Sequence, residues 1–78
     1  MFNMLKTKKL TNGEIENRFF QGYALACATL YRLHGGGTEL TEMWNHCGIK
    51  IADLKKYEID QFDIDSLIEA KSFDDRMK

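Results

Sequence analysis

The chain of 78 residues contains no proline, only two cysteines and a net charge of −1. Without proline, no helix is forced to break or kink by that residue. Because the net charge is near zero, the whole molecule has no electrostatic attraction for nucleic acid or for a membrane surface. The most apolar stretch, residues 22–31, is too short and too interrupted to span a bilayer. With no signal peptide either, the sequence predicts a protein of the reducing cytoplasm.

The familiar chemical motifs are missing as well. There is no Cys-x-x-Cys pair, and the adjacent His46 and Cys47 would point about 100° apart on a helix, so we expect no metal site. Residues 34–37 read HGGG, as in the oxyanion hole of lipases, but the Gly-x-Ser-x-Gly elbow that must accompany it is absent. No Gly-Lys-Ser/Thr follows the glycines, which excludes a phosphate-binding loop. We therefore expect no catalytic residues, no cofactor and no enzyme.

One long, strongly patterned helix is predicted over residues 12–34. Apolar side chains recur there every three or four residues, as on one face of an α-helix. The predicted core face is Ile15, Phe19, Tyr23, Ala26, Leu30 and Leu33, with a second stripe of Phe20, Cys27 and Tyr31 beside it. A helix that is apolar most of the way round is buried on several sides. We expect this helix to be the centre of the fold.

Both ends of this helix carry recognisable signals. Thr11 and Glu14 form a Thr-x-x-Glu capping box at its start, and Gly35 suits the left-handed conformation that ends a helix. Its small residues Gly22 and Ala26 would let another backbone come close. A homodimer in which the helix also packs on a second copy is therefore an alternative to a purely internal core helix.

The rest of the chain reads as short helices. Helical spacing predicts one helix over residues 40–47, another over 51–57, and a last one that begins near residue 60 and continues to about 71. Residues 1–10, with three lysines, read as a loosely held arm that could touch phosphate, and residues 73–78 as a frayed tail. The sequence thus predicts one all-α domain over 11–72, a bundle of three to four helices. The expected core is Ile15, Phe19, Phe20, Tyr23, Leu30, Leu33, Leu40, Met43, Trp44, Ile49, Leu54, Ile59, Phe62, Ile64, Leu67 and Ile68.

Residues 40–57 have some features of a DNA-binding helix-turn-helix. Gly48 lies where the turn would be, and Lys50, Lys55 and Lys56 would face DNA. Two features oppose this interpretation. Trp44 is too large for the position at which the two helices cross, and an acidic segment that phosphates would repel follows the second helix. A small DNA-binding regulator is therefore the second hypothesis for function.

An acidic strip lies between residues 58 and 70, where there is no lysine or arginine. Its members are Glu58, Asp60, Asp63, Asp65 and Glu69. They could simply be solvated and cap helices, or they could face a basic protein surface. Trp44 and Tyr57 are candidate anchors beside the strip if they are exposed. Asp63 and Asp65 do not form a calcium loop, because the glycine and distal glutamate of such a loop are missing.

A rhythm of short motifs runs from residue 14 to residue 67. It comprises Tyr23-Ala24-Leu25-Ala26, residues 30–35, Cys47-Gly48-Ile49, Ala52-Asp53-Leu54, Ile59-Asp60 and Phe62-Asp63. In this rhythm the chain resembles small helical proteins encoded by bacteriophages and prophages. The resemblance implies the cytoplasm of a bacterial host cell and a modulator of host machinery, with anti-defence proteins among the examples. We expect a non-enzymatic protein that binds a basic surface of a host protein, with no membrane partner.

Overall fold

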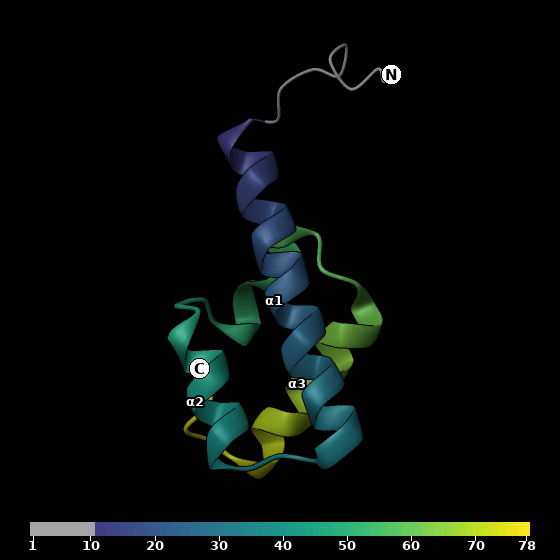
Figure 1. Ribbon diagram of the computed structural model, residues 1–78, viewed down its shortest axis with the longest axis vertical. Helices are drawn as coiled ribbons and strands as arrows, with labels where there is room; N and C mark the ends of the chain where they lie inside the picture. Colours follow the sequence, from purple (N-terminus) through teal and green to yellow (C-terminus); the bar gives the residue numbers. More distant parts are fainter. Residues whose placement is uncertain (1–10) are drawn as a thin grey trace, which may run out of the picture.

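The computed structural model describes residues 11–78 of the chain. They form the α-helices α1 (Asn12–His34), α2 (Thr38–His46) and α3 (Gln61–Phe73), and a 3₁₀ helix η2 (Ile51–Tyr57). Figure 1 shows α1 as the longest element, with the other helices gathered around its C-terminal part. The all-α bundle around one long helix is therefore confirmed. The predicted arm, 1–10, lies outside the described residues.

The ends of α1 are those that the sequence predicted. The Thr11 hydroxyl accepts a hydrogen bond of 3.0 Å from the Glu14 amide, and the Glu14 carboxylate accepts one of 2.8 Å from the Thr11 amide. At the other end the Gly35 amide donates a 2.7 Å bond to the Tyr31 carbonyl. These bonds satisfy backbone groups that a helix end leaves without partners. The φ of Gly35, 79°, is positive, as predicted, but its ψ of −176° is extended and differs from the predicted left-handed helical conformation.

Helix α1 is the element on which the others pack. It contacts α2, η2 and α3, and η2 also contacts α3. The ring of Phe20 lies 4.7 Å from that of Tyr57, and Gln21 donates a 3.1 Å hydrogen bond to the Tyr57 carbonyl. The Tyr23 hydroxyl donates to the Met43 carbonyl of α2. The core between these helices consists of Ala24, Cys27, Ala28, Leu40, Trp44, Ile49, Ile51, Leu54, Ile59, Ile64, Leu67, Ala70 and Met77.

The main predicted core face of α1 is largely wrong, because Ile15, Phe19, Ala26 and Leu33 are exposed. The second predicted stripe is confirmed, since Cys27 is buried and Phe20 and Tyr31 pack against the core. The buried side, which also includes Ala24 and Ala28, lies more than a third of a turn away from the main predicted face. Its small side chains let the neighbouring backbones approach closely, and the N-terminal turns of α1 extend beyond the rest of the fold (Figure 1). Two further predicted core residues, Phe62 and Ile68, are also exposed.

The segment that would read DNA differs from the expected recognition helix. Residues 51–57 form a 3₁₀ helix rather than an α-helix. Within residues 11–78 the backbones of α2 and η2 do not come close to each other; each lies against α1, and Trp44 and Leu54 meet only within the common core. A helix-turn-helix needs its two helices locked together by apolar contacts. This part of the chain does not form that arrangement.

The C-terminal residues fold back onto the body, so the prediction of a frayed tail over 73–78 is wrong. Met77 is only 1% exposed. The Asn45 side chain donates a 2.9 Å hydrogen bond to the Arg76 carbonyl, and the Ile51 amide donates a 3.1 Å bond to the Lys78 carbonyl. Met77 is the one buried side chain of this segment, and charged residues surround it in the sequence. For this reason the sequence of the segment resembles that of a solvated tail.

Candidate functional site

The acidic strip contributes one ion pair to the interior. Asp63 is buried, and its carboxylate lies 3.1 Å from the Arg32 guanidinium. Arg32 also donates a 2.9 Å hydrogen bond to the Ser66 hydroxyl and lies 4.4 Å from the centre of the Phe62 ring. Asp63 therefore joins α3 to α1 and does not present its charge to a partner.

Other acids of the strip bond within their own part of the chain. Asp60 caps α3 by accepting a 2.8 Å hydrogen bond from the Phe62 amide, and Asp65 accepts one of 2.8 Å from the Gln61 side chain. Glu58 ends η2 in the left-handed conformation, at φ 60°. Burial, together with the nearby Glu69 carboxylate, raises the pKa of Tyr31. Asp60 and Asp65 thus stabilise the start of α3, while Glu58, Asp60, Asp65 and Glu69 are all exposed.

The two aromatic candidates differ in exposure. Trp44 is fully buried, with its ring edge-on to Tyr23 at 6.4 Å between centres, so it cannot be a surface anchor. Its indole Nε1 has no hydrogen-bond partner among the described residues. Tyr57 is half-buried against Phe20, and the Lys56 ammonium lies 5.7 Å from the centre of its ring.

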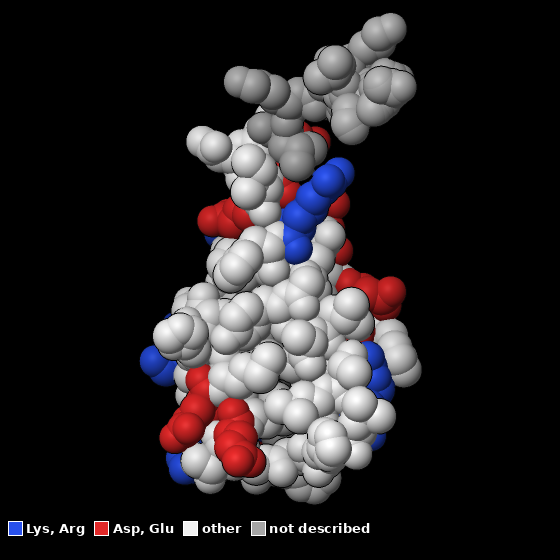
Figure 2. All heavy atoms as spheres, in the orientation of Figure 1, with Lys and Arg blue, Asp and Glu red and all other residues white. Residues whose placement is uncertain are grey.

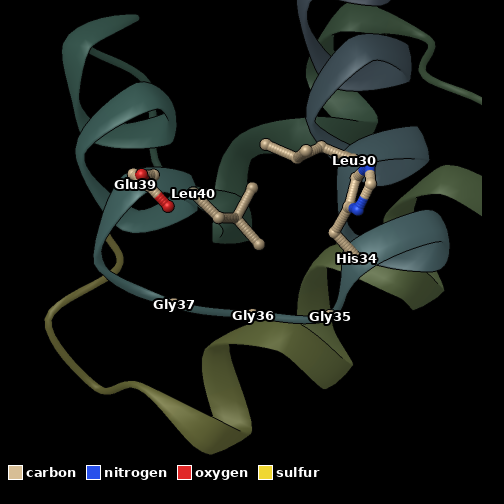
Figure 3. A pocket seen from close by; sticks show the side chains of 7 residues that line it. All are labelled: Leu30, His34, Gly35, Gly36, Gly37, Glu39 and Leu40. Carbon is tan, nitrogen blue, oxygen red and sulfur yellow. The ribbon is translucent and has the colours of Figure 1, made fainter.

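Residues 34–37 line a shallow cleft of about 430 Å³ between the end of α1 and the start of α2. Figure 3 shows Leu30 and His34 on the α1 side of it, with Leu40 projecting into the gap. No serine or cysteine lines it. Cys27 is buried in the core, and that burial raises the pKa of its thiol to about 12, so little of the nucleophilic thiolate forms. Across residues 11–78, no three His, Cys, Asp or Glu side chains are grouped to hold a metal ion.

A groove between η2, α3 and the C-terminal residues has a different character. Its volume is about 350 Å³. Its floor is apolar, and lysines surround it without an acidic residue among the lining side chains. The lining residues are Lys50, Ile51, Ala52, Leu54, Lys55, Ile64, Ile68, Lys71 and Lys78.

The local structure explains why these residues meet. In a 3₁₀ helix, side chains three apart lie on the same side, which places Ile51 and Leu54 together toward α3. On α3, Ile64 and Ile68 are four residues apart and therefore lie on one face. The groove lies on the side of η2 where these two faces meet.

The C-terminal residues complete the rim of the groove. The hydrogen bond from the Ile51 amide to the Lys78 carbonyl holds the end of the tail beside the start of η2. The Lys71 ammonium donates to the Met77 carbonyl, so this lysine also fastens the tail. Lys50 and Lys55 were singled out from the sequence only as DNA contacts. The other two lysines were missed, because their place depends on a tail whose docking has no clear sequence signal.

Comparisons of the chain with protein-family models, with curated protein sequences and with solved structures find no match. Within residues 11–78 no helix combines the length and the hydrophobicity needed to cross a membrane. The interpretation of function therefore rests on the geometry and charge of the lysine-rimmed groove.

Proposed function

We propose that the protein is a non-enzymatic binding module whose lysine-rimmed groove takes an acidic, amphipathic segment of a partner protein. The observation that supports this most directly is the composition of the groove. Aliphatic side chains of η2 and α3 form its floor, and Lys50, Lys55, Lys71 and Lys78 lie around it. An apolar floor binds apolar side chains by removing them from water, and a ring of positive charge attracts carboxylates.

The size and openness of the groove favour a protein segment over a small molecule. At about 350 Å³ it lies near the lower end of the range for small-molecule pockets. The groove is open to solvent, and Ile68 is half exposed in it. An amphipathic helix could lay its apolar side chains on such a surface while its flanking carboxylates reach the lysines.

The charge of the groove changes the kind of partner expected. From the acidic strip the sequence predicted a host protein with a basic surface. The groove favours an acidic segment instead, because its four rim charges are all positive. Lysine suits this role, since its long stem lets the ammonium follow carboxylates at slightly different positions.

The groove also gives a reason to prefer protein over nucleic acid. Lys50 and Lys55 are two of the residues that the DNA-binding hypothesis selected. Single-stranded nucleic acid usually needs aromatic side chains for base stacking, and none lines this groove. A duplex would leave the aliphatic floor uncovered. Binding to nucleic acid is therefore one outcome of the experiment below and not the proposal.

A designed peptide tests the chemistry of the groove. The probe is a fluorescein-labelled helical peptide with leucines at i and i+4 flanked by glutamates, and its control carries lysine in place of each glutamate. We expect only the acidic peptide to bind, and salt to weaken its binding. The double substitution Lys50→Glu with Lys55→Glu should weaken binding at least about tenfold, because two attractions become repulsions.

The matched comparison is Lys55→Glu alone against Lys56→Glu, which makes the same charge change at a residue that does not line the groove. Anisotropy titrations measure affinity, and amide shifts in NMR spectra locate the peptide. Equal weakening by Lys56→Glu, or shifts confined to residues outside η2 and α3, would refute the groove as the site. Tighter binding to a DNA duplex than to the acidic peptide would favour the regulator hypothesis.

The role of the partner is a further part of the proposal, supported by the resemblance to phage proteins. On that basis the partner is a bacterial host protein whose activity this module modulates. Affinity capture from a bacterial lysate, with nuclease present, tests it by mass spectrometry. A host protein held by the wild type and released by the Lys50→Glu, Lys55→Glu variant would support the proposal. Capture that disappears with nuclease would oppose it.

A further inference from the structure

The side of α1 that faces away from the core is itself apolar. Ile15, Phe19 and Leu33 are 52%, 58% and 72% exposed. They lie on the side of the helix opposite to the buried Ala24 and Ala28. In Figure 2, which has the orientation of Figure 1, uncharged atoms cover most of the middle of the visible face. A helix with two apolar sides has only one of them covered in this fold.

The residues along this exposed side have a regular order. They are Ile15, Phe19, Gly22, Ala26, Thr29 and Leu33, and we call them the α1 seam. Successive members are four, three, four, three and four residues apart. This is the spacing of the positions through which two helices pack in a coiled coil. No charged residue interrupts the α1 seam over its whole length.

The α1 seam also has an internal symmetry, since its spacings read the same from either end. If the α1 helices of two chains lie antiparallel, with residue 24 of one beside residue 24 of the other, Ile15 of one chain meets Leu33 of the other. Phe19 then meets Thr29, and Gly22 meets Ala26. Ile15 and Leu33 form an apolar pair at each end, Phe19 faces the smaller Thr29, and the two smallest residues lie where the helices come closest. A two-fold interface requires such a self-complementary surface.

Gly22 supplies a second indication. A glycine within a helix costs about 1 kcal/mol relative to alanine. A side-chain carbon built on Gly22 would meet nothing within 4 Å, so packing within the chain does not require a glycine there. In the antiparallel pair the missing side chain lets the two backbones approach at their crossing point.

The available area reaches the size of a specific interface. Leu25 lies on the flank of the α1 seam, and Phe62 contacts Arg32 farther round the same flank; they are 51% and 62% exposed. Together with Ile15, Phe19 and Leu33 they present about 500 Å² of apolar surface per chain. Two copies would thus bury about 1,000 Å², which is near the lower limit for a stable protein interface.

We propose that a second copy of this chain covers the α1 seam, in an antiparallel pair of α1 helices related by a two-fold axis level with residue 24. The antiparallel direction places the projecting N-terminal turns of one α1 beside the body of the other (Figure 1). A parallel pair would bring the projecting turns of the two chains together, away from either body. The lysine-rimmed groove lies on η2 and α3, so this pairing does not use it.

Sedimentation equilibrium of the full chain between 5 and 500 µM tests the association. We expect a dimer that Leu33→Glu dissociates, with a dissociation constant raised at least about a hundredfold, because the glutamate would be buried in the seam. The matched control is Phe73→Glu, a substitution at a side chain of similar exposure outside the α1 seam. It should leave the dimer intact.

Gly22→Leu separates the two roles of this position. It should raise the thermal stability of the monomeric fold, because leucine is a better helix former, and it should weaken the dimer by holding the helices apart. A wild type that stays monomeric at 500 µM would overturn the proposal and leave a different protein as the occupant of the face. A dimer that Leu33→Glu does not weaken would also overturn it.

Cysteine crosslinking tests the direction of the helices, in a Cys47→Ser background to remove the more exposed native thiol. The two copies of Leu25 are only about 3 Å apart along the helix axis, on the same flank of the seam, so a short bifunctional maleimide should link two copies of Leu25→Cys. In the antiparallel pair the two Leu33 positions are about 27 Å apart, and Leu33→Cys should not crosslink. Efficient crosslinking of Leu33→Cys without that of Leu25→Cys would refute the antiparallel arrangement.

Discussion

The anchoring of the C-terminal residues gives a sharp prediction through Met77. Its side chain is 1% exposed and belongs to the same core as Trp44 and Leu54. Met77→Ala removes most of that side chain without changing charge. If the tail belongs to the cooperative fold, the whole domain loses stability. If the tail docks independently, only its own attachment is lost.

The size of the effect follows from the burial. Replacing a fully buried methionine by alanine costs about 2–5 kcal/mol, and the lower half of this range applies where neighbours can relax. Met77 lies one residue from the end of the described chain, so we expect about 2–3 kcal/mol. A domain of 78 residues has a total stability of roughly 4–12 kcal/mol. The substitution should thus remove a large share of it.

Urea unfolding followed by circular dichroism and by Trp44 fluorescence measures this loss. With a slope of about 1 kcal/mol per molar urea for a small domain, the midpoint should fall by about 2–3 M. The control is Met77→Leu, which nearly preserves volume and should cost less than about 1.5 kcal/mol. The fluorescence and dichroism transitions should coincide if the tail unfolds with the core.

A midpoint shift below about 0.5 M for Met77→Ala, with the same slope as the wild type, would refute this reasoning. It would show that the tail contributes almost nothing to the cooperative fold. The buried position of Met77 would then be only one of several arrangements of the tail.

Further predictions concern the ion pair, a cysteine and an aspartate. Arg32→Ala should reduce the free energy of unfolding by about 2–3 kcal/mol, because it leaves the Asp63 carboxylate buried without its partner. Adding Asp63→Asn should recover part of that loss in a double-mutant cycle by urea unfolding, and no recovery would refute the pairing. At pH 8 the thiol of Cys27 should react with a disulfide reagent far more slowly than that of Cys47. The reason is that burial, and then the neighbouring Cys47, raise the pKa of the Cys27 thiol to about 12. Both thiols should react in denaturant, and equal rates in the native protein would contradict the prediction. Hydrogen bonds from Arg76, and secondly from Thr41, lower the pKa of Asp74 in the folded protein. The stability that the Asp74 carboxylate contributes is therefore present above about pH 4, near the pKa of an aspartate in the unfolded chain, and is lost as the pH falls toward the folded-state pKa. Asp74→Asn should therefore reduce the drop in urea midpoint between pH 5 and pH 2.5, and an unchanged drop would refute this assignment.

The sequence predicted the length and ends of α1 because its caps are local signals. Thr11, Glu14 and Gly35 act on backbone groups within a few residues, so their pattern can be read without a tertiary structure. The inward face was wrong for a different reason. The helix carries two apolar sides, and helical spacing alone does not say which one meets the body. Ala24 and Ala28 contribute little hydrophobicity, but they allow the closest packing.

The lysine-rimmed groove could be predicted only in part. Lys50 and Lys55 lie in a segment whose charge pattern was visible, although it suggested DNA. Lys71 and Lys78 join them through the folded-back tail, a contact between distant segments that no local pattern indicates. The 3₁₀ form of η2 was missed too, since its apolar spacing fits an α-helix equally well.

The docking of the tail has a consequence for how the protein is made. Thr41 and Asn45 of α2, and Ile51 at the start of η2, all bond to residues that are synthesised about thirty positions later. During translation these hydrogen bonds cannot form until residues 74–78 have been synthesised, whereas the capping bonds of α1 can form as soon as that segment leaves the ribosome. The groove acquires its full rim only after Lys78 has been synthesised and its carbonyl has accepted the hydrogen bond from Ile51.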